Sequence, residues 1–132
     1  MTNSEKDWIL VLEDDAIFKE KFGLKIKKQL EDIPDLVGAI FIGGGFPQER
    51  TSLTLGEWGN FLIKHHPATN TTIGYMLRRS AVEKIMKDFS TFDMPIDYEL
   101  AYLLMRTNTL VFHQDPYSIQ EGSKLVYSSS IR

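Results

Sequence analysis

The stretch Trp8-Ile9-Leu10-Val11-Leu12-Glu13-Asp14-Asp15 decides how the chain folds, because an unbroken apolar run ends abruptly at three carboxylates. An apolar run of this length is typical of a strand that is covered on both faces in an α/β sheet. We therefore expect Trp8 to Leu12 to form a central strand. The carboxyl ends of such strands are where open α/β sheets bind their ligands.

The three carboxylates Glu13, Asp14 and Asp15 favour a bound cation. Like charges a few ångströms apart repel one another, and partial burial strengthens the repulsion. Hard oxygen ligands suit Mg²⁺ or Mn²⁺, which commonly keep coordination positions for the phosphates of a nucleotide. The alternative is that Asp14 or Asp15 caps the next helix while the other carboxylates face water.

Hydrophobic periodicity predicts the remaining elements. Phe18, Phe22, Ile26 and Leu30 recur every fourth residue among lysines, which indicates an amphipathic helix closed by Pro34. We expect further strands over residues 36–42, 73–77 and 109–113, the last of these being the final strand along the chain. A long loop with short elements is expected from about 46 to 72. A second helix is expected from the Ser80 to Glu83 capping box to about Phe89, and a third after Pro95. The fold class is α/β, with a mixed sheet flanked by helices.

Composition limits the classes of function. A chain of 132 residues with 42% hydrophobic residues fits one domain over residues 1–132. The net charge of -3 and the lack of a basic block disfavour a nucleic-acid partner. The absence of cysteine excludes disulfides and thiolate metal sites. No apolar run is long enough for a transmembrane segment, so we expect a soluble, cytoplasmic protein.

Two known families share the acidic opening. The segment Ile9 to Asp15 resembles the start of response-regulator receiver domains. Receivers place a phospho-accepting aspartate after the strand that corresponds to residues 37–42, but glycines occupy positions 43–45 here, and no Lys-Pro pair follows a late strand.

A second resemblance extends over nearly the whole chain. Residues 8–16 resemble the metal-binding "LEDDA" segment of glycosyltransferase family 25, the lipopolysaccharide and collagen galactosyltransferase-like group, and residues 72–81 resemble its "T-x-G-Y-x-x-x-R-x-A" block. Pro95-Ile96-Asp97 is similar to its "P-I/V-D" element, and Pro116 with Gln120 and Ser130-Ile131 to its C-terminal signature. Members normally carry a sizeable N-terminal nucleotide-binding portion before the acidic segment, so the resemblance is to the C-terminal part of the domain.

The family resemblance implies a partial GT-A-like (Rossmann-like) fold and a metal-dependent transfer, with inversion, of a sugar, often galactose, from a UDP-sugar donor to a glycan or protein-linked acceptor. It implies Asp15, with Asp14 or Glu13, as ligands of Mn²⁺ or Mg²⁺, and His113 as a further ligand. It makes Asp97 the base that accepts the proton of the acceptor hydroxyl. The substrate-binding residues that it implies are Thr72, Gly74, Tyr75, Arg79 and Gln120.

Each of these residues also has a structural alternative. Asp97 could cap a helix, Gly74 and Tyr75 could belong to a plain packed strand, Arg79 could be a solvated charge, and His113 could be a core histidine. For the whole chain, the alternative to an enzyme is a noncatalytic or incomplete transferase half that acts as an interaction module. Such a module would need a partner chain or a second copy to supply the missing surface, and an exposed hydrophobic sheet edge would favour it.

Overall fold

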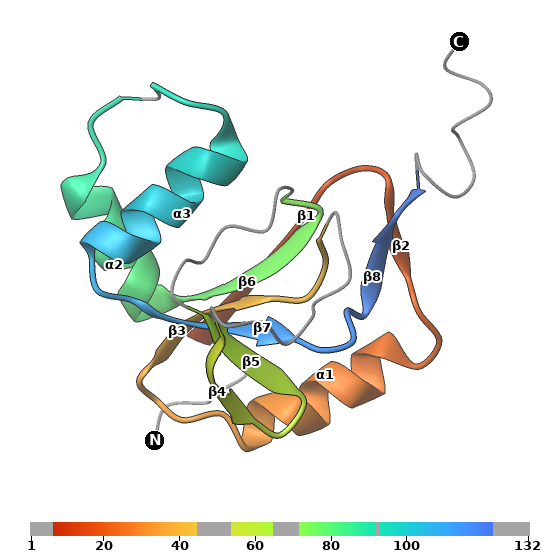
Figure 1. Ribbon diagram of the computed structural model, residues 1–132. Helices are drawn as coiled ribbons and strands as arrows, with labels where there is room; N and C mark the ends of the chain where they lie inside the picture. The colour runs from red at the N-terminus through yellow and green to blue at the C-terminus, as the bar shows by residue number, and fades with distance from the viewer. Residues whose placement is uncertain (1–6, 45–53, 65–71, 92, 123–132) are drawn as a thin grey trace, which may run out of the picture.

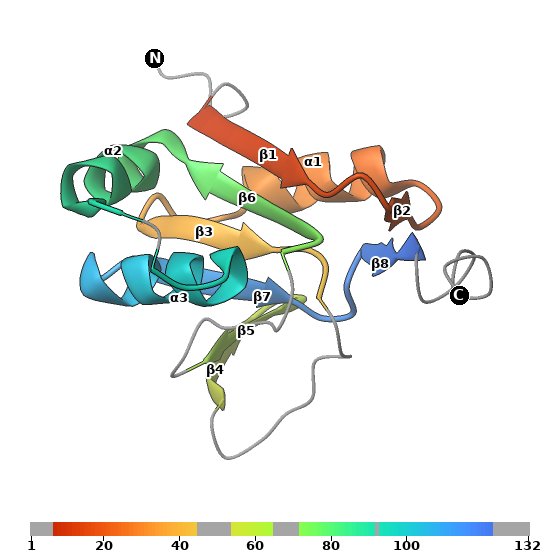
Figure 2. The same cartoon turned by 90° about the horizontal axis from the view of Figure 1, so that it is seen from above.

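A six-stranded mixed sheet forms the centre of the structure (Figure 1). The computed structural model describes residues 7–44, 54–64, 72–91 and 93–122. In spatial order the strands are β1 (Trp8–Leu12), β6 (Gly74–Arg78), β3 (Val37–Phe41), β7 (Leu110–Gln114), β5 (Phe61–Lys64) and β4 (Thr54–Trp58). Figure 2 shows the strands side by side in this order.

The strand directions bring three carboxyl ends to one edge of the sheet. Strand β6 is antiparallel to both β1 and β3, so β1 and β3 are parallel to each other, and β3 is parallel to β7. The ends of β1, β3 and β7 therefore share one edge with the start of β6. We call this the carboxyl edge.

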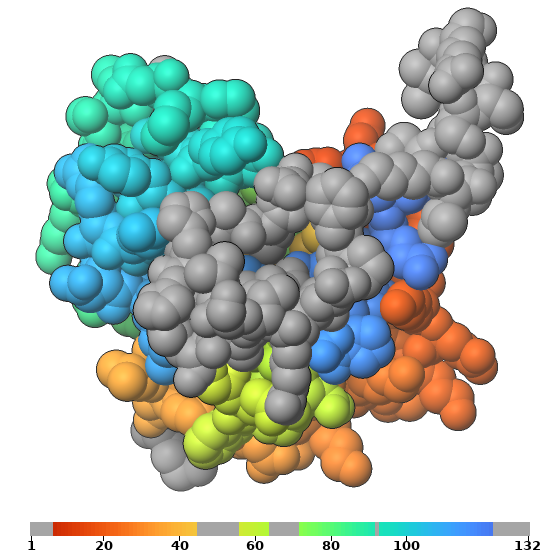
Figure 3. Space-filling model, viewed as in Figure 1, coloured from red at the N-terminus to blue at the C-terminus, as the bar shows by residue number. Residues whose placement is uncertain are grey.

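Helices cover both faces of the sheet. Helix α1 (Phe22–Glu31) lies on one face, where its Ile26 joins a core cluster with residues such as Ile40 and Phe112. Helices α2 (Arg79–Asp88) and α3 (Ile96–Arg106) lie on the other face, where Ile85 and Leu104 pack on the sheet. Figure 3 shows α2 and α3 on one flank of the molecule and α1 on the other.

A small second sheet lies beside the carboxyl edge. Strands β2 (Ala16–Phe18) and β8 (Ile119–Glu121) pair antiparallel. The Ile119 side chain fills the space beside Gly74, where an added Cβ would lie 2.7 Å from Ile119 Cδ1. Gly74 therefore allows β8 to pack closely against the start of β6.

The predicted fold class, a mixed α/β sheet flanked by helices, is confirmed. The strand over Trp8–Leu12 has the predicted bounds, and β3, β6 and β7 lie within a residue of theirs. The helix after Pro95 is also present. Within the described ranges, no helix is both long and apolar enough to cross a bilayer.

The prediction that Trp8 to Leu12 forms a central strand is wrong. Strand β1 is at the end of the strand order, and Ile9, Leu10 and Leu12 are 49%, 40% and 37% exposed. The apolar run indicated a strand correctly, but it did not show how many neighbours the strand has. Strand β1 thus leaves an apolar edge uncovered among the described residues.

Three local expectations also need correction. Phe18 belongs to β2 rather than to the helix, although its ring packs 4.7 Å from that of Phe22. Helix α2 begins at Arg79 without a side-chain cap, so Ser80 does not form the predicted capping box. The expected irregular loop contains the β4–β5 hairpin, and β8 follows the strand that we expected to be the last.

Arg78 anchors the far end of β6, opposite the carboxyl edge. It is only 7% exposed, its Nε donates to the carbonyl of Val37 at 2.8 Å, and its NH1 pairs with Asp7 at 3.2 Å. The guanidinium also lies 4.3 Å from the ring centre of Trp8. Arg78 therefore links β1, β6 and the start of β3 through one buried cation.

Replacing Arg78→Met should lower the free energy of unfolding by about 2–3 kcal/mol, because the buried Val37 carbonyl and Asp7 lose a charged donor. The neighbouring variant Arg79→Met should change it by less than about 0.5 kcal/mol, since Arg79 is exposed. Urea denaturation followed by circular dichroism measures both values. Equal losses in the two variants would contradict this role of Arg78.

Candidate active site at the carboxyl edge

The acidic segment is tied to its neighbours through the backbone. Glu13 N–H donates to the carbonyl of Ile73 at 3.1 Å, and the Glu13 carbonyl accepts from Ala16 N–H at 3.2 Å. The Asp15 carbonyl accepts from Gly122 N–H at 2.7 Å. These bonds hold the turn between β1 and β2 against the start of β6 and the end of β8.

Glu13 lies between two of the predicted substrate-binding residues. Thr72 is buried, and its Oγ1 donates to Glu13 Oε1 at 2.5 Å. Burial raises the pKa of the Tyr75 phenol above its usual value, and the charge of Glu13 raises that pKa further. The structure therefore brings Glu13, Thr72 and Tyr75 together at the carboxyl edge.

The three residues of the acidic segment differ in exposure. Glu13 and Asp14 are exposed and Asp15 is half-buried. The alternative that either residue caps the next helix is wrong, because α1 begins only at Phe22, and Lys21 is its N-cap. Across the described ranges, no group of three or more histidine, aspartate or glutamate side chains is placed to hold a metal ion.

His113 lies away from the acidic segment, in the core. It is fully buried, and its ring stacks on Phe41 at 5.3 Å. In register across the sheet, His113 pairs with Phe41, Phe41 with Tyr75, and Tyr75 with Val11. Three strand spacings separate His113 from β1, or about 14 Å. The structure does not bring His113 to the three carboxylates.

The first turn of α3 lies towards the same edge of the sheet. Residues 107–109 join α3 directly to the start of β7, so the helix runs back over the sheet and begins near the carboxyl ends (Figure 2). Asp97 is half-buried there, and its Oδ1 accepts from Tyr98 N–H at 3.0 Å. Asp97 thus lies in the first turn of α3, and one of its oxygens accepts from the next backbone N–H.

Sequence reasoning missed a buried carboxylate on α3. Glu99 is 6% exposed, and it lies one turn before Leu103, which packs in the core under α3. Glu99 lies four residues before Leu103, and positions i and i+4 share a helix face. This spacing could have predicted that Glu99 is buried. Glu99 therefore places a second carboxylate near the first turn of α3.

The other predicted residues differ in their distance from this edge. Gln120 is exposed on β8, opposite Ile17 of β2, beside the acidic turn. Arg79 follows Arg78 at the other end of β6, about 16 Å from Gly74 along the strand. The structure does not bring Arg79 to the carboxyl edge. Its buried neighbour Arg78 stabilises the packing of β1, β6 and β3 instead.

The chain matches no protein-family model and no curated protein in the comparisons made.

Replacing Glu13→Gln should lower the pKa of Tyr75, because the carboxylate charge that disfavours the phenolate is removed. The pKa should stay above about 10, the usual tyrosine value, because burial, the larger cause, remains. Titration of the Tyr75 ring by ¹³C NMR measures the change. In the control Asp14→Asn the Tyr75 pKa should not move, and an unchanged value in Glu13→Gln would contradict the proximity of these groups.

Proposed function

We propose that the chain is a metal-dependent inverting glycosyltransferase domain of partial GT-A-like fold that transfers a sugar, galactose being the expected one, from a UDP-sugar donor to a glycan or protein-linked acceptor. The observation that supports it is the assembly of the acidic segment, Thr72 and Tyr75 at the carboxyl edge. Three parallel strands end there, as in α/β proteins that bind ligands at this edge.

The proposed metal ion would take some ligands from the acidic segment and others from the donor phosphates. Asp14 and Asp15 are the proposed ligands, because one oxygen of the exposed Glu13 accepts from Thr72 and His113 is enclosed in the core. Mg²⁺ and Mn²⁺ are commonly held by one or two carboxylates together with substrate phosphates. When bound, the metal would neutralise charge developing on the UDP leaving group. Because the described residues place so few ligands at this edge, we expect metal and UDP to bind together.

Asp97 would act on the acceptor from the α3 side of the edge. Its Oδ1 is held by Tyr98 N–H, which leaves Oδ2 to accept the proton of the acceptor hydroxyl. The acceptor oxygen then forms a bond to the anomeric carbon, and the bond from that carbon to the diphosphate breaks, with its electron pair leaving on UDP. Attack from the side opposite the leaving group inverts the anomeric centre.

Calorimetric titration with UDP in the presence of Mn²⁺ should give saturable binding that is lost in EDTA. In Asp15→Asn this binding should weaken about tenfold or more, because one of two carboxylate ligands is lost. The control Asp35→Asn alters an exposed carboxylate in the turn before β3 and should bind as the unsubstituted chain does.

Asp97→Asn separates binding from transfer. Its UDP affinity should be unchanged, because Asp97 is proposed to contact the acceptor, while hydrolysis or transfer of UDP-galactose should fall. Equal UDP binding by the unsubstituted chain and by Asp15→Asn would contradict the proposed role of Asp15 as a metal ligand. An absence of UDP binding by the folded chain would overturn the enzymatic proposal.

The second candidate is an interaction module, which the uncovered edge of β1 favours. Trp8 to Leu12 carries no charged or proline residue that would block strand pairing, and large side chains are exposed on both faces of the strand. A partner strand, from another protein or from a second copy, would bind the N–H and C=O groups of β1 that no described strand pairs with. A receiver-like signalling module is the less favoured form of this second candidate. Gly43 and Gly44 stand after β3, where a receiver domain has its phospho-accepting aspartate.

Replacing Leu10→Lys should reduce self-association, because it puts a charge into the middle of the uncovered strand. Leu24→Lys is the matched control, since Leu24 is 73% exposed on α1, away from this edge. Sedimentation equilibrium over a range of protein concentrations compares the variants. A purely monomeric unsubstituted chain, or equal effects of both substitutions, would contradict pairing between copies through β1.

A further inference from the structure

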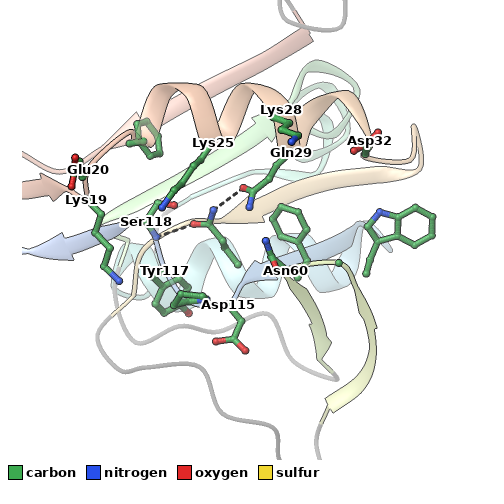
Figure 4. Close-up of a pocket in the computed structure, with 16 residues that line it drawn as sticks. Lys19, Glu20, Lys25, Lys28, Gln29, Asp32, Asn60, Asp115, Tyr117 and Ser118 are labelled. Carbon is green, nitrogen blue, oxygen red and sulfur yellow. Dashed lines mark hydrogen bonds between the residues drawn. The ribbon is translucent and has the colours of Figure 1, made fainter.

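A pocket of about 520 Å³ opens on the α1 side of the sheet (Figure 4). One wall is the face of α1 that carries Phe22, Lys25 and Gln29, and the other is the turn of the β4–β5 hairpin at Trp58. The β7–β8 connection, residues 114–118, closes the pocket. Such a volume falls in the usual range for small-ligand sites, ~300–1,000 Å³.

The floor of the pocket is a fixed amide. Gln114 is 2% exposed, its Nε2 donates to Gln29 Oε1 at 2.8 Å, and its Oε1 accepts from Ser118 N–H at 2.9 Å. These bonds orient Gln29, whose oxygen faces Gln114. Because the Gln29 oxygen already accepts from Gln114, the Gln29 amide nitrogen is the group that we expect to donate to a ligand. A preorganised amide of this kind recognises hydroxyl groups as well as carbonyls.

Charges of both signs surround the pocket. Lysines and carboxylates contribute equally, three of each, so the lining carries no net charge: Lys19, Lys25, Lys28, Glu20, Asp32 and Asp115. A phosphate would meet as many repulsive groups as attractive ones. A hydroxyl, which both donates and accepts, can bond to either kind of side chain.

Aromatic rings complete the lining. Trp58 is 48% exposed at the hairpin turn, and Phe22 and Tyr117 lie in the walls. Burial raises the pKa of the Tyr117 phenol, and Asp115 raises it further, so that the hydroxyl stays protonated. Exposed indole rings pack well on the C–H faces of pyranose sugars, which are apolar on their faces and polar at their rims.

We propose that this pocket binds a short, uncharged oligosaccharide, with a sugar ring on Trp58 and hydroxyls on Gln29 and the charged rim. The inference goes beyond the proposed transfer reaction and does not depend on it. The pocket lies on the α1 face of the sheet, whereas Glu13 acts on Tyr75, which packs under α2 and α3. The two sites can therefore be tested separately.

Titration of the ¹⁵N-labelled chain with lactose, cellobiose and maltotriose tests the proposal by NMR. At least one of them should give saturable shifts at the Gln29 and Gln114 side-chain amides and at the Trp58 indole N–H. Trp58→Ala should weaken this binding about tenfold, and Gln29→Leu should weaken it several-fold. Tyr102→Ala removes a comparably exposed ring on α3 and should leave it unchanged.

The result that would overturn the proposal is the absence of saturable shifts at these groups with all three sugars, or equal weakening by Trp58→Ala and Tyr102→Ala. Shifts at the pocket with inorganic phosphate but with none of the sugars would assign an anion site and also overturn it. UDP binding that depends on Mn²⁺ and on Asp15 is measured independently, so a failure at the pocket leaves the transfer proposal standing, and the reverse also holds.

Discussion

Strand β6 runs antiparallel between β1 and β3, and this pairing determines which residues of the chain meet. It places Thr72 and Gly74 beside the end of β1, where Glu13 accepts a hydrogen bond from the Thr72 hydroxyl. It also carries Arg78 to the opposite end, where one buried cation ties β1 to the start of β3. The carboxyl edge and the Arg78 anchor thus lie at opposite ends of β6.

The sequence predicted strands and helices better than it predicted their neighbours. An apolar run such as Trp8–Leu12 predicts a strand, but it does not predict the number of neighbouring strands. Both a central strand and an uncovered edge strand are compatible with the same run. The β4–β5 hairpin was not predicted for a different reason. Gly59-Asn60 is a dipeptide typical of two-residue hairpin turns, and it separates Trp58 from its partner Phe61. Scattered aromatic and glycine residues around it obscured that signal.

The candidate site was predictable in composition but not in geometry. The acidic triplet indicated ligand binding, but it could not show that Thr72, 59 positions away, donates to Glu13. Nor could it show that Glu13 and Asp14 are exposed while Asp15 is half-buried. Arg79 matched a motif position and His113 was an implied ligand, but strand order and strand length set them about 14–16 Å from the site. The α1 pocket was beyond sequence reasoning, because its walls come from three separate segments.

The acidic segment and the uncovered strand are adjacent, so the two proposed functions are physically linked. Glu13 directly follows Leu12, and a strand that pairs with β1 would lie about 4.8 Å from it and end beside the acidic turn. Glu13, Asp14 and Asp15 follow the uncovered strand directly, and within the described residues no three acidic or histidine side chains are placed to hold a metal ion. A strand bound to β1 would therefore shield the carboxylates from water and strengthen their attraction for a cation. In the proposed enzyme, donor affinity should then depend on whether a strand is paired with β1.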